Sequence, residues 1–171
     1  MDDERFESAW SAYGPAVLRY CTYSTGTSHE GEDVAAETFI RFLTKGAHVP
    51  PESVEAWLIR VARNLCARHH RTAKRRRLLE LHLAEGLATE TEAWTRPDSW
   101  EYVRRLKETE RLLIYLRIAE DRPFADIARL LRKSEGAVKM TFYRAIERLR
   151  QEMVRDGASP ETVFMGGADC V

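Results

Sequence analysis

The stretch SEGAVKMTFYRAIERLR, from Ser134 to Arg150, combines an apolar face with a basic face. Ser134 stands where a hydroxyl can cap the first turn of a helix, and Gly136 inside that turn allows another surface to come close. Apolar side chains recur every three or four residues, which predicts one buried helix face; they are Val138, Phe142, Ala145, Ile146 and Leu149.

A shorter apolar helix is predicted just before it, in PFADIARLL from Pro123 to Leu131. Ile127, Leu130 and Leu131 are expected in the core, and the small Ala128 allows two helices to cross closely. Two such helices joined by a short turn are typical of a helix-turn-helix, whose second helix enters the major groove of DNA. The candidates for base contacts are Lys139, Tyr143 and Arg144.

The same periodicity also fits an ordinary amphipathic helix pair with a solvated charged face. Arg132 occupies the turn, where glycine is often used for a left-handed backbone; a non-glycine residue there costs on the order of 1 kcal/mol. That cost is too small to exclude the motif.

A second basic segment lies earlier, on a helix predicted to begin near Ser53. From Ala56 to Leu79 there is no acid, and neutralising phosphates with such cations yields salt-dependent affinity for nucleic acid. Trp57 and Asn64 are two helical turns apart, so an aromatic ring for stacking and an amide for a base edge share one face. The alternatives are Trp57 in the core and a solvated basic face. The bases are Arg60, Arg63, Arg68, Arg71, Lys74, Arg75, Arg76 and Arg77.

Charge is segregated along a chain of 171 residues that has 27 basic and 27 acidic side chains and a net charge of zero. Residues 1–55 and 80–101 lean acidic, while the two predicted DNA-binding helices are basic. Such segregation indicates basic surfaces for an anionic partner and acidic surfaces for another partner.

Several classes of protein are disfavoured by what the sequence lacks. There is no apolar run near the roughly 18 residues of a membrane span, and the acidic N-terminus is unlike a secretory signal. Three scattered cysteines fit a reducing cytoplasm better than a disulfide framework. We find no metal-ligand spacing, no phosphate loop and no catalytic nucleophile motif, so we expect no metal, no cofactor and no enzyme activity.

The sequence predicts an all-α fold of two small helical domains joined by a flexible linker. Helices are expected over 4–23, 32–45 and from 53 onward, with loops over 25–31 and 46–53, and then over 107–121, 124–131 and 134–150. The predicted divisions are a first domain at 4–78, an acidic linker at 79–100, a second domain at 101–153 and a disordered tail at 154–171.

These motifs, in this order, resemble the extracytoplasmic-function (ECF) group of bacterial sigma factors, the initiation subunits of RNA polymerase. The residues that carry the resemblance are GEDVAAETFIRFL (Gly31 to Leu43), EAWLIRVARNLCARHHRTAKRRR (Glu55 to Arg77) and ERLLIYLRIAEDRPFADIARLLRKSEGAVKMTFYRAIERLR (Glu110 to Arg150). The resemblance covers most of the chain from Phe6 to Arg150.

The resemblance implies a role for each domain. The first would bind the clamp helices of the largest polymerase subunit through Asp33, Glu37, Phe39 and Arg41. It would also open the promoter −10 element, with the 46–53 loop holding a flipped base. The −10 contacts would be Trp57, Arg60, Arg63, Asn64, Arg68, Arg71, Lys74, Arg75 and Arg76.

The second domain would read the −35 element and reach the flap region of polymerase. Its implied DNA contacts are Ser134, Gly136, Lys139, Met140, Tyr143, Arg144 and Arg148. The implied partners are core RNA polymerase, promoter DNA and an anti-sigma factor or other regulator, in the cytoplasm and without membrane insertion.

Some residues depart from the family pattern, and other functions stay open. Arg122-Pro123-Phe124 and Arg132 differ from the usual start and turn of the helix-turn-helix, which affects the expected promoter sequence more than the function. The main alternative is a stand-alone helix-turn-helix regulator with a sensing or dimerising first domain. A structural or adaptor bundle and a nuclease are further alternatives; charge segregation opposes the first, and the missing catalytic motifs oppose the second.

Overall fold

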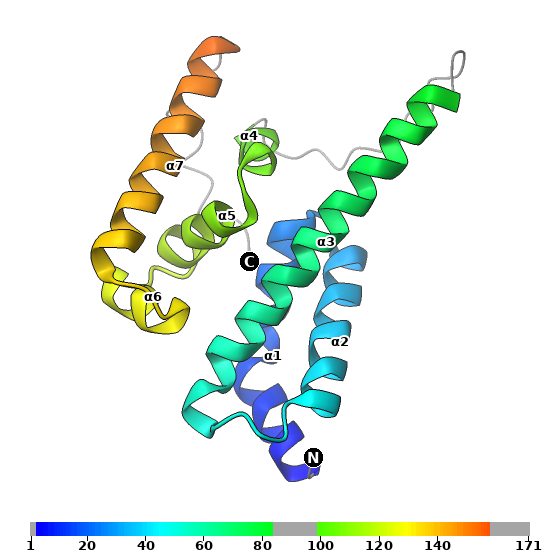
Figure 1. The fold of residues 1–171 in the computed structure, drawn as a ribbon, viewed down its shortest axis with the longest axis vertical. Helices are drawn as coiled ribbons and strands as arrows, with labels where there is room; N and C mark the ends of the chain where they lie inside the picture. Colours follow the sequence, from blue (N-terminus) through cyan, green and yellow to red (C-terminus); the bar gives the residue numbers. More distant parts are fainter. Residues whose placement is uncertain (1–2, 84–98, 158–171) are drawn as a thin grey trace.

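The computed structural model describes residues 3–83 and 99–157, and every regular element within them is helical (Figure 1). The first domain comprises α1 (Asp3–Thr25), α2 (Ser28–Lys45), a single 3₁₀ turn η1 (Pro51–Ser53) and α3 (Val54–Leu83). The second comprises α4 (Ser99–Arg105), α5 (Glu108–Ile114), the π-helical η2 (Tyr115–Ala119), α6 (Phe124–Leu131) and α7 (Glu135–Arg155). The all-α, two-domain prediction is confirmed.

Helices α1 and α2 cross closely where a loop was predicted over residues 25–31. Helix α2 already begins at Ser28, because the Thr27 hydroxyl accepts the Glu30 backbone N–H and caps the helix. Gly31 therefore lies inside α2, where a Cβ atom would stand only 2.6 Å from Thr22 Cα. The glycine that suggested a loop permits a helix crossing instead.

The connection from α2 to α3 differs from the prediction at its end. Gly46 ends α2 as expected, with its backbone N–H donated to the Phe42 carbonyl at 2.7 Å. Ser53 was expected to cap α3, but it lies in η1 and α3 follows directly at Val54. The Ser53 hydroxyl accepts a hydrogen bond from Arg132 instead.

The helices on either side of the predicted linker extend into it. Helix α3 extends to Leu83, beyond the expected end at residue 78, and α4 begins at Ser99. The rest of the predicted linker, 84–98, lies outside the described residues, as does most of the predicted tail, 158–171. Residues 154 and 155 belong to α7 rather than to a tail.

The helix expected over 107–121 changes its pitch halfway. It starts as α5 and continues as η2, where the Glu120 N–H bonds to the Tyr115 carbonyl five residues earlier, at 3.1 Å. This turn leaves the Tyr115 ring against Tyr20 and Tyr23 of α1, with centroids 5.5 and 4.9 Å apart. A helical turn in the second domain thus packs on the first.

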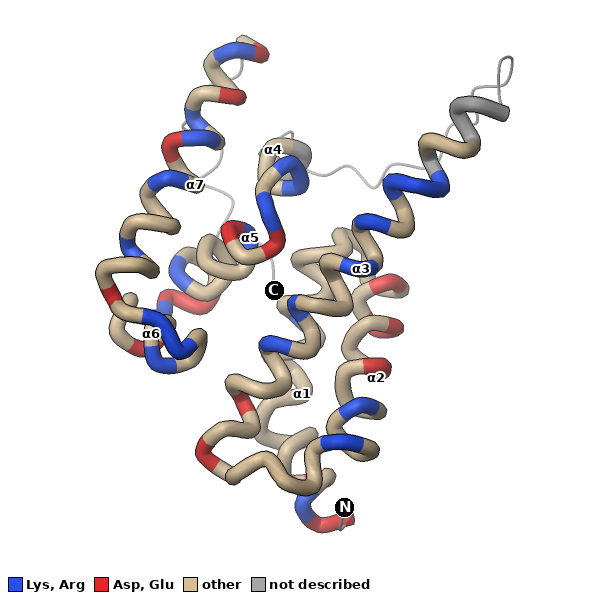
Figure 2. Tube along the Cα trace, in the orientation of Figure 1, with Lys and Arg blue, Asp and Glu red and all other residues tan. Residues whose placement is uncertain are grey.

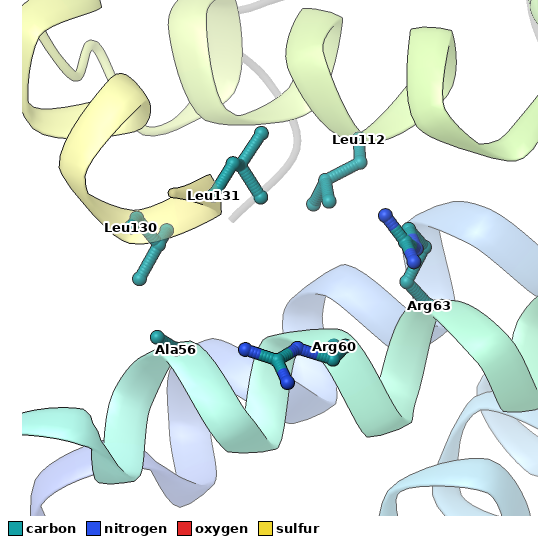
Figure 3. A pocket seen from close by; sticks show the side chains of 6 residues that line it. All are labelled: Ala56, Arg60, Arg63, Leu112, Leu130 and Leu131. Carbon is teal, nitrogen blue, oxygen red and sulfur yellow. The ribbon is translucent and has the colours of Figure 1, made fainter. Parts of the chain in front are cut away.

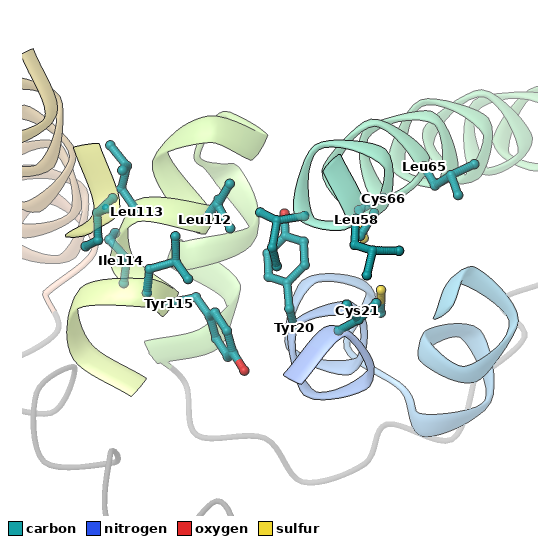
Figure 4. Close-up of a cluster of buried hydrophobic side chains, with 14 of the residues drawn as sticks. Tyr20, Cys21, Leu58, Leu65, Cys66, Leu112, Leu113, Ile114 and Tyr115 are labelled. Atoms are coloured by element: carbon teal, nitrogen blue, oxygen red, sulfur yellow. The ribbon is translucent and has the colours of Figure 1, made fainter. Parts of the chain in front are cut away.

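The buried side chains form one continuous core across both domains (Figure 4). Tyr20 and Cys21 of α1 face Leu58 and Cys66 of α3, and Leu112 of α5 lies on the side of the second domain; all five are fully buried. Cys66 is thus buried as a small apolar side chain. The two domains therefore share an apolar contact in this arrangement, in addition to the covalent connection.

Candidate DNA-binding and partner-binding surfaces

Helix α2 carries three of the implied polymerase contacts at a spacing of four residues, Asp33, Glu37 and Arg41, which are called the α2 row below. Asp33 lies 3.9 Å from His29, and the Arg41 guanidinium donates to the Glu37 carboxylate at 2.8 Å. Exposed Ile40 and Leu43 lie on the same helix. The row is thus an accessible surface with both charged and apolar contacts to offer.

Phe39 does not belong to that surface. Its side chain is 2% exposed, with the Phe6 and Trp10 rings packed edge-on against it at 6.2 and 4.7 Å. The resemblance-based assignment of Phe39 as a polymerase contact is therefore wrong for direct contact, because a buried ring supports the helix from inside.

The basic face of α3 follows the helix beyond the bundle, as the blue bands in Figure 2 show. Asn64 is exposed, and its side-chain oxygen accepts from Arg63 at 3.1 Å. Six predicted phosphate contacts are exposed: Arg60, Arg68, Arg71, Lys74, Arg75 and Arg76. Their exposure leaves them accessible to an anionic partner.

Trp57 combines the two roles weighed from the sequence. Its ring packs on buried Phe42 with centroids 5.6 Å apart, yet the residue is only partly buried. Asn64, two turns later, is exposed. A base that reaches Asn64 would meet the accessible part of the indole rather than a free ring.

The helix-turn-helix of α6 and α7 forms as predicted. Arg132 at its turn has φ 52° and ψ 49°, the left-handed conformation expected there. Ser134 caps α7 by accepting the Ala137 backbone N–H at 3.3 Å. Gly136 is exposed with open space around it, so the first turn of α7 can approach another surface.

The outward face of α7 mixes cations with large apolar groups. Met140 and Tyr143 are exposed by 55% and 61% of their surface, and Arg144 is also exposed. Lys139 is paired with Glu135 at 2.6 Å, and this acid raises the pKa of the lysine. Such a face can offer both hydrogen-bond donors and thymine-methyl contacts in a major groove.

Arg148, one of the expected −35 contacts, also forms an ion pair inside the second domain. Its Nη1 atom donates to both carboxylate oxygens of Glu110 on α5, at 3.1 and 3.0 Å. Glu110 is itself buried, so breaking this pair would leave a buried charge without its partner. The pair with Glu110 stabilises the domain, and the assignment of Arg148 to the −35 contacts stays a prediction because the side chain is still 44% exposed.

Glu108 of α5 joins the two domains, and sequence reasoning missed it. Its Oε1 atom accepts from the Tyr20 hydroxyl at 2.6 Å and from the Ser24 hydroxyl at 2.8 Å, both on α1. Its other oxygen accepts from Arg111 of its own helix, and His70 of α3 lies 3.6 Å away. Only 9% of the Glu108 side chain is exposed, so this is a buried polar cluster.

Burial sets the protonation of this cluster. The pKa of His70 is lowered to about 4, mainly by burial and then by Arg111, while Glu108 opposes the shift. His70 is therefore neutral at pH 7, and its approach to Glu108 is not an ion pair. Burial, followed by the nearby carboxylate of Glu108, also raises the pKa of Tyr20, which keeps the hydroxyl protonated as a donor.

Ion pairs surround the interface between the domains. Arg19 of α1 binds Glu120 at 3.1 Å, and Arg122 binds Glu55 at the start of α3 at 2.6 Å. Burial alone would raise the pKa of Glu120, but hydrogen bonds from Tyr115 and Arg19 outweigh it and the pKa is lowered. The acid is consequently charged and paired at neutral pH.

Part of the basic face of α3 borders the interface between the domains. Arg60 and Arg63 border a small cavity whose opposite wall is formed by the second domain (Figure 3). That wall is made by Leu112 of α5 with Leu130 and Leu131 of α6. In the packed arrangement Arg63 is half-buried, whereas Arg60 and the later part of the basic face are exposed.

None of the helices within 3–83 and 99–157 has the length and apolarity to cross a membrane. In the same residues, no group of three or more His, Cys, Asp or Glu side chains is arranged to hold a metal ion.

Comparison with known families assigns both domains. Residues 9–76 match the model of sigma-70 region 2, and residues 100–149 match that of sigma-70 region 4. Together these matches span more than half of the chain. The chain belongs to the ECF group of the sigma-70 family. Region 2 contains the α2 row and most of the basic face of α3, whereas region 4 contains the helix-turn-helix.

Individual relatives agree with this assignment. The chain is 30% identical over 165 residues to the ECF RNA polymerase sigma factor BldN of Streptomyces coelicolor, a match that covers 90% of this chain but 62% of BldN. It is 25% identical over 174 residues to the ECF sigma factor SigW of Bacillus subtilis, covering 89% and 90% of the two chains.

A solved structure shares the fold. The chain matches one from the complex of the sigma factor RpoE with the anti-sigma factor NepR from Bartonella quintana, with a TM-score of 0.59 and 21% identity. The match covers 90% of this chain and 99% of that one.

Proposed function

We propose that this protein binds core RNA polymerase and directs it to start transcription at promoters with a particular −35 and −10 sequence. The observation that carries the proposal is that one chain joins an accessible basic helix in region 2 to a helix-turn-helix in region 4. The proposed work is binding, recognition and strand opening in the cytoplasm, with no chemical step assigned to the chain.

Region 2 is proposed to open the −10 element with α3. Cations supply affinity for the backbone of a separated strand, and Asn64 offers an amide to the edge of an unstacked base. The partly buried Trp57 would form the inner wall of that contact. The loop 46–53 is proposed to hold a base turned out of the stack.

Region 4 is proposed to read the −35 duplex with α7. Lys139, Tyr143 and Arg144 project from the N-terminal half of that helix, which is the part that reaches base edges in a helix-turn-helix. Met140 adds an exposed apolar group beside them. Ser134 and Gly136, at the start of α7, are proposed to lie near the phosphate backbone.

The α2 row is proposed to bind the clamp helices of the largest polymerase subunit, and region 4 the flap region. Asp33, Glu37 and Arg41 supply the charged contacts, and Phe39 holds the helix from inside. We also propose an anti-sigma factor or similar regulator as a third partner, since the structurally similar RpoE is bound by NepR.

DNA binding also requires a change of arrangement. Arg63 is half-buried beside the cavity wall formed by α5 and α6. Region 4 therefore has to move away from α3 before Arg63 becomes fully accessible to a DNA strand. We infer that polymerase binding favours the separated arrangement.

A direct test separates this function from that of a stand-alone regulator. Purified protein is mixed with bacterial core RNA polymerase and passed through a gel-filtration column, and its binding to duplex DNA is measured without polymerase. A stable complex, together with weak DNA binding by the free protein, is expected because the net charge is zero. Tight sequence-specific binding without polymerase, and no complex with it, would favour the regulator.

A further inference from the structure

The first turn of α1 is tied to the loop between α2 and α3, as the position of the N-terminal end beside that loop in Figure 1 illustrates. The Arg5 guanidinium donates from Nη1 to the Ala47 carbonyl at 2.9 Å and from Nη2 to the Gly46 carbonyl at 3.1 Å. Nη2 also donates to the Val49 carbonyl. One side chain thus gathers three backbone carbonyls of a four-residue stretch.

Contacts hold the inner side of the 46–49 loop in place, and the outer side of the loop is exposed to solvent. The Val49 N–H bonds to the Gly46 carbonyl at 3.0 Å, and a Cβ atom on Gly46 would stand 2.4 Å from the Phe42 ring. The Arg5 guanidinium carbon lies 5.9 Å from the centroid of that same ring. Ala47 and His48, by contrast, are exposed.

We propose that Arg5 is a positioning residue for promoter opening: it holds the backbone of the 46–49 turn so that the exposed side of the loop can receive an unstacked −10 base. This inference rests on the proposed function of the loop. A site for one base must be held close to its working geometry, and a displacement of about 1 Å can cost a large factor in rate.

The contact lies within the first domain alone, which distinguishes it from the contacts between the domains. Ser53 and Glu55, just beyond the loop, are bound by Arg132 and Arg122 of the second domain. Those two contacts end when the domains separate, whereas Arg5 and its three carbonyls move together. Arg5 can therefore hold the loop in the separated arrangement in which DNA is bound.

The geometry also requires arginine rather than any cation. A guanidinium presents several N–H groups in a fixed planar fork and can serve separated acceptors, whereas a lysine ammonium is a point donor. Arg5→Lys keeps the charge but loses the fork, so it should behave much more like Arg5→Ala than like the wild type. Lys45→Ala is the matched control, because it removes a positive charge next to the loop and none of the three carbonyl contacts.

The test compares these variants as polymerase complexes. Each protein is first checked for helical content and for co-elution with core polymerase. Opening is then followed with a fluorescent base in the −10 element, and base preference is measured on single-stranded −10 oligonucleotides. For Arg5→Ala and Arg5→Lys we expect opening to slow by about tenfold and preference to be lost at one −10 position. Lys45→Ala should retain both.

A double-mutant cycle shows whether Arg5 acts through the loop. His48→Ala changes the exposed side of the same turn, so its effect on base preference should largely vanish once Arg5 is replaced. Fully additive effects would overturn the proposal, as would unchanged opening and preference in Arg5→Ala. An equal loss of core-polymerase binding and of opening would assign Arg5 a general structural role instead. If the wild-type protein forms no polymerase complex, the proposed function itself fails.

Discussion

Cations on α3 and cations on α7 are set in different surroundings. Along α3 the sequence from Ala56 to Leu79 contains no acid, and most of its basic side chains are exposed. On α7, Lys139 pairs with Glu135 at 2.6 Å, and Arg148 pairs with Glu110 of α5 at 3.0 Å. The first surface is suited to attracting phosphates, and the second to reading a groove by shape and by specific contacts.

The two helices also differ in how accessible their cations are to DNA. The outward face of α7 is exposed, whereas Arg63 on α3 is half-buried beside the wall formed by α5 and α6. The helix that reads duplex DNA can therefore meet its target in the packed arrangement, but the helix that handles the separated strand cannot do so completely. We therefore expect α7 to recognise duplex DNA first. Separation of the domains and opening of the strands at α3 would follow.

The strongest way to sharpen this comparison is to break the polar cluster between the domains. Glu108→Ala removes the acceptor for Tyr20 and Ser24 and leaves Arg111, which is 4% exposed, without its carboxylate. Losing one partner of a buried pair typically costs about 3–5 kcal/mol, and urea unfolding should show a loss of that size. Glu135→Ala removes an exposed partner and should cost below about 1 kcal/mol. Equal losses in the two variants would contradict the assigned role of the cluster.

Replacing Lys139 and Arg144 on α7 should strongly weaken recognition of the −35 sequence and leave polymerase binding intact. In Lys139→Ala with Arg144→Ala, preference for the correct −35 sequence over a scrambled one should fall by about 100-fold, since each base contact is worth about 1–3 kcal/mol. The measurement is competition binding by the polymerase complex. Normal −35 preference in this variant would remove α7 as the reading helix.

Low pH should weaken the packing between the two domains. The pKa of His70 is about 4 in the packed protein, against an ordinary value of about 6.5, so the unfolded chain binds more protons as pH falls below 6.5. Stability from this group is fully present above pH 6.5 and is lost as pH falls toward 4, by on the order of 2 kcal/mol. In urea unfolding across this range, His70→Gln should show a flatter pH dependence; an unchanged slope would exclude His70 as its source.

The smallest expected effect is on the salt dependence of single-strand binding, which should distinguish the cations of α3 from those of α7. Replacing Arg71 and Lys74 by alanine should lower the salt slope of single-strand binding by about 1.4 in total, because each phosphate contact contributes about 0.7. Titration of a −10 oligonucleotide at several salt concentrations measures it. The α7 double variant is the control, and it should keep the wild-type slope on the same oligonucleotide.

The sequence predicted most of what depends on local patterns. The helices, the left-handed turn at Arg132 and the Ser134 cap follow from periodicity and capping chemistry, and the structure confirms them. The polymerase contacts named on α2 stay a prediction, except that Phe39 is buried. Apolar spacing indicates that a ring is buried or close to burial, but a resemblance to a binding motif does not show which members of the motif face outward.

The missed features all depend on residues far apart in the chain. Glu108 and Ser24 are 84 positions apart, Arg148 and Glu110 are 38 apart, and Arg5 contacts carbonyls 41 to 44 positions away. A charged residue looks the same in a sequence whether water, a distant acid or a loop backbone accepts its hydrogen bonds. Only the packing of the helices identifies the partner.

The most direct test of the central claim is transcription by the reconstituted polymerase complex from a library of random promoter sequences. We expect active templates to share a −35 and a −10 element at a fixed separation. Lys139→Ala with Arg144→Ala should erase the preference for the −35 element alone. No transcripts above those of core polymerase, or loss of both elements together in that variant, would contradict the division of work between α3 and α7.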